Sequence, residues 1–517
     1  MIRPGAEPSA DIRFRRERSA RIMETAFGTT DEGFRIITGD AIEIVYASLS
    51  GLYFALISLA RRINSGQLSA DFFDYPRFSV RGVIEGYYGP PWSDEARRSM
   101  IRLLPEMRMN SFFYGPKNDP YHRELWREPY PPEMLGQIAV LQRLCSDQGS
   151  RFWYGIGPGL SMHYSLEDDR RKLLSKLQQL HSLGINHFGL YLDDIPETLL
   201  HADDIETFND LAEAHISLIN EVYRELTAMD PEIRLVVCPT RYWGEPGYYL
   251  ARLSAEIDYR ILIFHTGPEI CSRELTLRDG AVMQQLTNRP VLYWDNYPVN
   301  DLEMSHRLHI GPYRGRDPHL YRVSAGIVAN GMEYAEASKI PLMTIGDYLW
   351  NPESYEPEDS FRAAVRRIAG ETDWEDFFPF ADNNRASCLY PNDQSLFKQM
   401  IEFFGHAMHQ GNEVRAVEIL SEEYRRLSRA EALFQRGMEN SLLEKEILPW
   451  REQFGRGVRF LGEVLNLLDA PAAERPGKFL DLEEAGSAFL SERWYVFSDV
   501  LSSFIREVII LFQGAVK

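Results

Sequence analysis

Two adjacent carboxylates, Asp193 and Asp194, are the residues of this chain whose type and spacing point most directly to chemistry. They follow the apolar run FGLYL at 188–192, so they come at the end of a segment that is predicted to be buried. Two nearby like charges disfavour simultaneous ionisation and tend to keep one group protonated. One carboxylic acid and one carboxylate form the pair that cleavage of a glycosidic bond requires. A solvated turn, like the one expected at Asp168 and Asp169, is the alternative that local sequence leaves open.

Other polar and aromatic residues also stand directly after apolar runs, and they form a set of one chemical kind. Aromatic rings can cover the apolar face of a neutral sugar, while acids and amides bind its hydroxyl groups. Any single member could merely cap a loop, but the whole set predicts a sugar site. Its members are Glu85, Tyr87, Tyr88, Lys117, Asn118, Asp119, Asp193, Asp194, Arg241, Tyr242, His265, Thr266, Trp294, Asp295, Asn296, Asp347 and Trp350.

The elements that must position these residues are short apolar runs, each followed by a Gly, Pro, Asp or Asn cluster and a helical stretch. Near-continuous apolar strands alternating with helices predict a parallel sheet covered on both faces. Eight repeats, with polar residues just after the strands, favour a (β/α)₈ TIM barrel over an open doubly wound sheet, and a barrel's active site lies at those strand ends. The predicted strands are VRGVIEG (80–86), SFFYG (111–115), FWYGIGP (152–158), HFGLYLDD (187–194), RLVVCPT (234–240), RILIFHTG (260–267), PVLYWDN (290–296) and LMTIGDYLW (342–350).

The fold class is therefore α/β, with three predicted domains. Residues 1–77 form a short, truncated N-terminal α/β segment, 78–365 the barrel, and 366–517 a C-terminal helical bundle domain. We expect the apolar helical faces of the last domain to pack within their own bundle. The alternative is that some of these helices reach the barrel mouth or a second subunit.

The net charge of −20 argues against a nucleic-acid partner, because such affinity comes largely from Lys and Arg neutralising phosphates. One basic run, Arg13, Arg15, Arg16, Arg18 and Arg21, is expected to be a solvated leader or helix face.

The most apolar stretch, residues 45–60, falls short of the roughly 20 residues that a membrane span needs, and its second half predicts a buried helix ending near Arg61 and Arg62. The first 25 residues lack a signal peptide's apolar core, so we expect a cytoplasmic protein without a membrane partner. The four cysteines are scattered, without zinc-ligand spacing, and are expected to be buried thiols.

Seven separated motifs closely resemble glycoside hydrolase family 84, which includes the protein O-GlcNAcases and bacterial β-N-acetylglucosaminidases. The resemblance runs from about residue 75 to 390, in family order. The motifs are RGVIEGYYGPPWS (81–93), YGPKNDPYHRELWREPYP (114–131), GLYLDDI (189–195), CPTRYWG (238–244), HTGPEI (265–270), YWDNYPVND (293–301) and DYLWNPESY (347–355). Gly115 and Asn118 depart from the family's more frequent Ala and Asp, at positions without a catalytic role.

The resemblance implies retaining, substrate-assisted catalysis without a cofactor or metal. The substrate's own 2-acetamido oxygen attacks the anomeric carbon and gives an oxazoline, outside the usual carboxylate-nucleophile scheme. By motif, Asp193 would orient and polarise the acetamido group, and Asp194 would be general acid and then general base. Tyr242 would line the acetamido pocket, which Trp294 and Asn296 would wall and hydrogen-bond.

The same resemblance implies four residues for the sugar hydroxyls. Gly86 would offer its backbone carbonyl, and Lys117 would bind a hydroxyl. Asp301 would hold the O4 and O6 side of the sugar, with Asn330 supporting that side.

The activity so implied is a β-N-acetylglucosaminidase acting on a GlcNAc-bearing glycoprotein or glycan. An endo-acting enzyme that cuts hyaluronan or chitin fragments is the enzymatic alternative. A non-catalytic sugar-binding barrel is the alternative of a different class. A homodimer is compatible with either enzyme.

Overall fold

The computed structural model describes residues 12–16, 24–25, 28–64, 66, 71–391 and 395–513. In it the chain divides into two compact units. The first consists of Met1–Tyr297, Gly315–Glu333 and Ile345–Tyr355, and the second of Pro298–Arg314, Tyr334–Thr344 and Glu356–Lys517. The predicted domain limits at residues 77 and 365 stay predictions.

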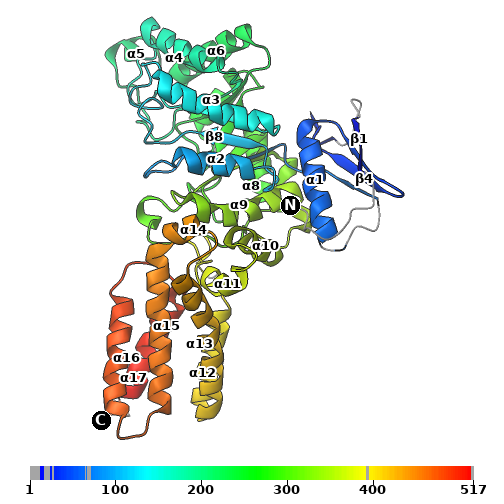
Figure 1. The fold of residues 1–517 in the computed structure, drawn as a ribbon. Helices are drawn as coiled ribbons and strands as arrows, with labels where there is room; N and C mark the ends of the chain where they lie inside the picture. Colours follow the sequence, from blue (N-terminus) through cyan, green and yellow to red (C-terminus); the bar gives the residue numbers. More distant parts are fainter. Residues whose placement is uncertain are drawn as a thin grey trace. The chain divides into compact units, whose positions relative to one another are not determined.

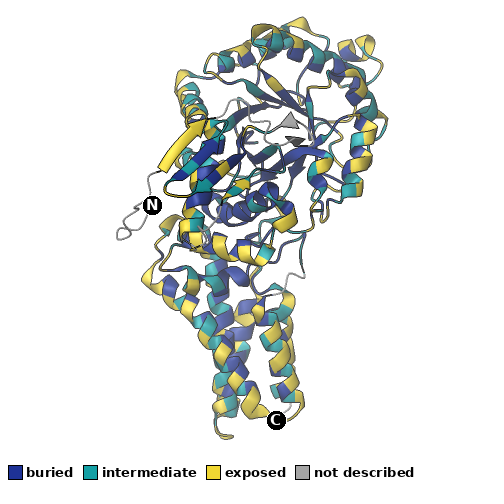
Figure 2. Cartoon of the chain, turned by 90° about the vertical axis from the view of Figure 1, so that its right-hand side faces the viewer, coloured by how far each residue is buried: buried dark blue, intermediate teal, exposed yellow. Residues whose placement is uncertain are grey.

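The centre of the first unit is a closed barrel of eight parallel strands (Figures 1 and 2). Its order around the barrel is β7 (Val80–Glu85), β8 (Ser111–Tyr114), β9 (Arg151–Ile156), β10 (His187–Tyr191), β11 (Arg234–Cys238), β12 (Leu262–His265), β13 (Val291–Asp295) and β14 (Ser324–Asn330). Because β14 pairs with β7, the sheet has no edge, which confirms the predicted TIM barrel and rules out the open sheet. Phe113, Trp153, Tyr191 and Phe264 belong to the buried cluster that fills it.

Helices follow the barrel strands, and Figure 2 shows exposed residues on their outward faces around buried strands. Ser93 accepts a hydrogen bond from the Ala96 N–H and caps the first of them. The helices are α2 (Asp94–Leu103), α3 (Pro132–Asp147), α4 (Glu167–His181), α5 (Ala202–Thr207), α6 (Leu211–Met229), α7 (Tyr248–Glu256), α8 (Leu277–Thr287) and α9 (Ala335–Trp350). Helix α9 is the exception to this exposure, because every residue of it except Asp347 is buried. Three short 3₁₀ turns are η1 (Leu302–Met304), η2 (Leu320–Arg322) and η3 (Pro352–Ser354).

The eighth strand was predicted in the wrong place. It is β14, whose seven residues are all buried, whereas the run LMTIGDYLW (342–350) lies in helix α9. A helix that is apolar on most faces cannot be told from a buried strand by periodicity. Asp347 and Trp350 are therefore not strand-end residues. Asp347 lies 3.5 Å from the Arg61 guanidinium, and Trp350 packs against Phe54 at 4.8 Å between ring centroids.

The N-terminal segment is a small sheet with one helix. Its four strands run in the order β1 (Ile12–Arg16), β5 (Ile42–Tyr46), β4 (Phe34–Thr38), β6 (Phe72–Asp74), with α1 (Leu49–Asn64) following β5. Phe34, Ile36, Ile44 and Phe54 form its buried core. A separate pair is β2 (Glu24–Thr25) with β3 (Gly28–Thr29).

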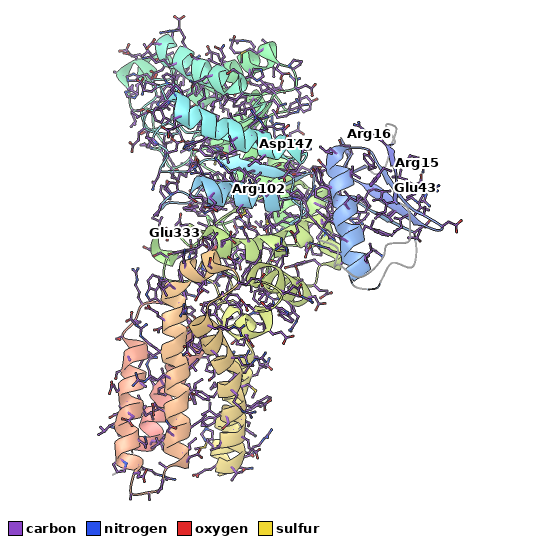
Figure 3. All side chains as sticks on the ribbon, viewed as in Figure 1. Arg15, Arg16, Glu43, Arg102, Asp147 and Glu333 are labelled. Carbon is purple, nitrogen blue, oxygen red and sulfur yellow. The ribbon has the colours of Figure 1, made fainter. Side chains whose placement is uncertain are left out.

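The basic run near the N-terminus is solvated as expected, but it is not a helix face. Residues 12–16 pair in parallel with β5 as strand β1, and all five are exposed. The Arg15 guanidinium lies 3.2 Å from the Glu43 carboxylate, and Figure 3 labels both side chains on this sheet. Alternation of Ile12, Arg13, Phe14 and Arg15 suits a strand better than a helix. Arg18 and Arg21 lie outside the described residues.

The second unit is helical after residue 356, which confirms the predicted C-terminal helical region. Its helices are α10 (Pro357–Ala369), α11 (Trp374–Asp382), α12 (Leu396–His409), α13 (Glu413–Arg436), α14 (Ser441–Glu446), α15 (Leu448–Asp469), α16 (Arg475–Leu490) and α17 (Ser498–Gln513) (Figure 1). Phe497 stacks on Phe454 with ring centroids 5.0 Å apart, and Phe504 meets Phe404 at 5.3 Å. These apolar faces therefore pack within their own unit.

In the described part of the chain, no helix is long and apolar enough to cross a membrane. Cys145 and Cys238 are buried as predicted, but Cys271 and Cys388 are partly exposed, which corrects the expectation that all four are buried.

Candidate active site

The paired carboxylates stand just beyond the carboxyl end of strand β10. The Leu192 N–H donates to the Cys238 carbonyl at 2.8 Å, so the pairing with the next strand continues up to the pair. Asp194 then takes a left-handed backbone conformation with φ 54°. Successive strand side chains point to opposite faces, and this break in the backbone ends that alternation. Both carboxylates can therefore lie near one ammonium group, that of Lys117.

Asp193 forms a buried ion pair with Lys117, which follows strand β8. The Lys117 ammonium donates to Asp193 Oδ2 at 2.5 Å, and both side chains are less than a tenth exposed. Burial works against the charge on Asp193, but the charge and hydrogen bond of Lys117 outweigh it and hold the pKa of Asp193 below its ordinary value. Burial likewise opposes the charge on Lys117, and the Asp193 carboxylate raises the pKa of Lys117 despite it. Asp193 is thereby kept ionised.

Asp194 has a different environment, made of phenols. Its side chain is 32% exposed and lies 3.7 Å from the Lys117 ammonium. Tyr242 donates to Oδ1 at 2.9 Å, and Tyr88 donates to Oδ2 at 2.6 Å. Burial, and then the nearby Asp194 carboxylate, raises the pKa of Tyr242, so its hydroxyl stays a neutral donor. The two neighbouring acids thus have unlike hydrogen-bond partners. Asp193 accepts from a buried ammonium group, and Asp194 accepts from two phenol hydroxyls.

A second linked group connects the ends of three adjacent strands, β7, β13 and β14. The Gly86 N–H donates to Asn330 Oδ1 at 3.2 Å, and the Asn330 amide donates to Asn296 Oδ1 at 3.1 Å. The Trp294 indole N–H donates to the same oxygen at 3.1 Å. The Asn296 amide in turn donates to the Ile270 carbonyl at 2.8 Å, in the loop after β12.

Lys117 lies close both to the carboxylate pair and to this second set of hydrogen-bonded residues. Its ammonium lies 5.8 Å from the centroid of the Trp294 ring and 5.5 Å from that of Tyr88, within cation–π range. The structure therefore brings together eight of the predicted site residues, namely Gly86, Lys117, Asp193, Asp194, Tyr242, Trp294, Asn296 and Asn330. The ninth, Asp301, belongs to the second compact unit, where it precedes η1.

Two of the predicted strand-end residues, Glu85 and Asp119, bind neighbouring side chains of the barrel instead. The Glu85 carboxylate is fully buried and accepts two hydrogen bonds from the Arg97 guanidinium, at 2.7 and 2.9 Å. Asp119 accepts hydrogen bonds from the hydroxyls of Tyr114 and Tyr130. Their burial with complete partners leaves them little capacity for a ligand.

Two contacts at the pair were not predicted. Tyr88 was one of the strand-end aromatic residues, but nothing in the sequence indicated that its hydroxyl would meet Asp194. Arg123 donates to the Tyr88 hydroxyl at 3.2 Å and to the Asp194 backbone carbonyl at 3.3 Å. Within the described ranges, no group of three or more His, Cys, Asp and Glu side chains is arranged to hold a metal ion.

Comparison with known proteins decides the family. The model of the beta-N-acetylglucosaminidase family matches residues 81–382. The chain belongs to this family. The resemblance to glycoside hydrolase family 84 is thereby confirmed. Six of the seven motifs that carried it lie at barrel strand ends, and the seventh, DYLWNPESY (347–355), lies at the end of helix α9.

Individual relatives agree with this assignment. The protein O-GlcNAcases of Rattus norvegicus and Mus musculus are each 33% identical over 274 residues, which is 52% of this chain and 29% of theirs. The chain thus matches less than a third of the length of these relatives. A mutant O-GlcNAc hydrolase of Thermobaculum terrenum superposes with a TM-score of 0.79 at 32% identity, covering 85% of this chain and 96% of that one. The structure of CpGH84B gives 0.79 at 25% identity, covering 93% and 86%.

Proposed function

We propose that this protein is a retaining β-N-acetylglucosaminidase that removes O-linked GlcNAc from proteins or glycans by substrate-assisted catalysis. The observation that carries the proposal is the unequal environment of the two adjacent acids. Asp193 is buried against Lys117 at 2.5 Å, whereas Asp194 is partly exposed and bonded to the hydroxyls of Tyr88 and Tyr242. Two carboxylates in different environments can take two different roles in one reaction.

In the first step, the acetamido carbonyl oxygen forms a bond to the anomeric carbon as the bond to the leaving oxygen breaks. Asp193, held ionised, accepts the acetamido N–H and stabilises the positive charge that develops on the amide. Asp194 acts as the general acid and gives a proton to the leaving oxygen. The product of this step is an oxazoline, and holding the amide beside the anomeric carbon supplies a large effective molarity.

In the second step, Asp194 takes a proton from a water molecule whose oxygen attacks the anomeric carbon. The bond between that carbon and the oxazoline oxygen breaks, the acetamido group is restored, and Asp194 is protonated again. Two inversions at one carbon give retention of configuration.

The remaining residues are proposed to hold the sugar. Tyr242, Trp294 and Asn296 would surround the acetamido group. Gly86, Asn330, Asp301 and Lys117 would bind hydroxyls. A series of hydrogen bonds runs from Gly86 through Asn330 and Asn296 to Trp294. It supports a shared role, because it fixes these groups relative to one another. An ammonium group has three donors, so Lys117 can serve Asp193 and a hydroxyl together.

The test is hydrolysis of an aryl N-acetyl-β-glucosaminide, with the configuration of the first-formed sugar read by NMR. We expect release of the β-anomer before mutarotation. The matched aryl β-glucoside lacks the acetamido group and should be a very poor substrate. Release of the α-anomer, or equal rates on the two substrates, would refute the mechanism. An inactive protein would favour the sugar-binding alternative, and release of oligosaccharides from hyaluronan or chitin, without GlcNAc, would favour the endo-acting one.

Gly86 packs closely against the Trp294 ring. A Cβ added there would lie 2.5 and 2.8 Å from carbons of the Trp294 ring, which is only 6% exposed and hydrogen-bonded to Asn296. We expect Gly86→Ala to lower the free energy of unfolding by about 1–3 kcal/mol, as overpacking usually does, and to lower kcat/KM about tenfold or more. Chemical denaturation and the aryl glycoside assay measure the two effects.

Gly136 on α3 offers the matched control, because a Cβ there has no neighbour within 4 Å. We expect Gly136→Ala to raise the free energy of unfolding by about 0.5–1 kcal/mol and leave kcat/KM unchanged. If Gly86→Ala behaved like this control, the proposed close approach of Gly86 to Trp294 would be wrong.

A further inference from the structure

The buried Arg316 guanidinium binds a residue next to the proposed site. Its side chain is 0% exposed, and it makes two hydrogen bonds to the Asp295 carboxylate, from Nε at 2.9 Å and from Nη2 at 2.6 Å. It also donates to the backbone carbonyls of Ser272, at 3.1 Å, and Arg273, at 2.9 Å. One planar group thus joins the end of strand β13 to the loop at residues 266–276.

The same loop is held by backbone pairing with the segment that carries Arg316. The Leu275 N–H donates to the Gly315 carbonyl at 2.9 Å, and the Asp317 N–H donates to the Leu275 carbonyl at 3.0 Å. Within the loop, the Ser272 hydroxyl donates to the Thr266 carbonyl at 2.9 Å. The loop before α8 is therefore a defined structure whose position depends on its attachment at residues 315–317.

This loop touches the proposed acetamido-binding residues from two directions. Its Ile270 carbonyl accepts the Asn296 amide at 2.8 Å. Its Thr266 N–H donates to the backbone carbonyl of Tyr242 at 2.8 Å, and Tyr242 is the donor to Asp194. Asp295, the carboxylate that Arg316 binds, stands between Trp294 and Asn296 in the sequence. Arg316 thus binds the residue that lies between Trp294 and Asn296 in the sequence.

We propose that Arg316 is a positioning residue that sets selectivity for the N-acyl group of the substrate. By fixing the loop against Asp295, it fixes the distance between that loop and the side chains of Trp294 and Asn296. A loop free to move outward would leave room for a longer acyl chain and hold an acetyl group less closely. The inference rests on the proposed function and deepens it.

Arginine suits this position because its planar fork can bind a carboxylate and two carbonyls at once. Lysine would keep the positive charge beside Asp295 but is a point charge on a flexible chain, so it cannot reproduce that geometry. Arg316→Lys therefore changes the geometry of the attachment without leaving Asp295 uncompensated.

The experiment measures kcat/KM for three aryl glucosaminides that carry N-acetyl, N-propionyl and N-butanoyl groups. One methylene is worth about 10–200-fold in a tight apolar site. We expect the ratio of acetyl to propionyl kcat/KM to fall about fivefold or more in Arg316→Lys. The ratio cancels the amount of active protein, so partial unfolding does not move it.

A matched control, Arg289, lies just before strand β13, at the end opposite to Asp295. Arg289, only 7% exposed, donates to the backbone carbonyls of four residues and precedes β13. Its acceptors are Ser254, Ile257, Asp258 and Ile261. Arg289→Lys should lower stability and leave the acyl ratio within about twofold of the wild type.

Each result decides something. An unchanged ratio in Arg316→Lys, or an equal fall in Arg289→Lys, would overturn the inference. If Arg316→Lys does not fold, Asp295→Asn tests the same attachment from its other side, and an unchanged ratio there would overturn it too. A wild-type protein inert on the N-acetyl substrate would overturn the proposed function, and this inference with it.

Discussion

Asp194→Asn is expected to lower kcat/KM by about 10²–10⁴-fold for substrates with poor leaving groups, because it removes the proton donor of the first step. Activated aryl glycosides need little protonation, so their kcat/KM should change far less. Their kcat should still fall, since the second step loses its general base, and KM should fall with it as the oxazoline accumulates. Steady-state kinetics over a series of aryl leaving groups measures this as a steeper dependence on leaving-group pKa.

The structure makes asparagine the right replacement. Asp194 has φ 54°, a left-handed conformation that asparagine and aspartate tolerate better than other side chains with a Cβ. The side chain introduced by Asp194→Asn can still accept a hydrogen bond from Tyr88 or Tyr242 through its amide oxygen. A loss of activity would therefore report the missing proton and not a displaced backbone.

Asp168 supplies the control, as a member of another adjacent pair of aspartates. It lies in the first turn of α4, with its side chain 41% exposed and paired with Lys172 at 2.8 Å. Asp168→Asn should leave all kinetic constants within about twofold. Equal losses for good and poor leaving groups in Asp194→Asn would remove Asp194 from the role of general acid.

The sequence predicted the barrel well because its strands are buried on both faces and form continuous apolar runs. The same property produced the one misplaced strand. Helix α9 is as apolar as a strand, while β14 (SAGIVAN) contains small residues with weak strand preference. The closing of β14 onto β7 depends on contacts distant in the sequence, which local composition does not record.

The candidate site was predictable as a set of residues but not as a network. The motifs name Lys117, Asp193 and Asp194, yet only the fold shows that one ammonium group serves both acids. Arg123 and Arg316 carry no local signal, because each acts through residues far along the chain. Asp301 falls in a segment whose relation to the site the sequence could name only by resemblance.

Asp193→Asn is expected to lower kcat/KM by about 10²–10³-fold for good and poor leaving groups alike. Every substrate must form the oxazoline in its first step, and the charge on Asp193 stabilises the positive amide that develops there. An amide side chain can still accept a hydrogen bond, but it brings no negative charge. The same aryl series used for Asp194→Asn measures this as a parallel downward shift without a change of slope.

The substitution should also cost stability, because it leaves Lys117 buried without its principal partner. Removing one member of a buried ion pair typically costs about 3–5 kcal/mol, and Asp194 at 3.7 Å offsets part of that. In the wild type, the pKa of Asp193 is lowered by folding, so the stability it contributes is present above the ordinary value of 3.8 and is lost as pH falls through the lowered pKa. The raised pKa of Lys117 gives a contribution that is present below 10.5 and is lost as pH rises through the raised pKa.

The pH dependence of unfolding separates this loss from the loss of catalysis. In Asp193→Asn, burial dominates at Lys117 and lowers its pKa, so stability should rise with pH in the alkaline range, opposite to the wild type. Adding Lys117→Met to the same protein removes the buried charge and should restore much of the stability without restoring activity. If that double variant regained activity along with stability, the carboxylate of Asp193 would be a structural partner of Lys117 and not the group that directs the acetamido oxygen.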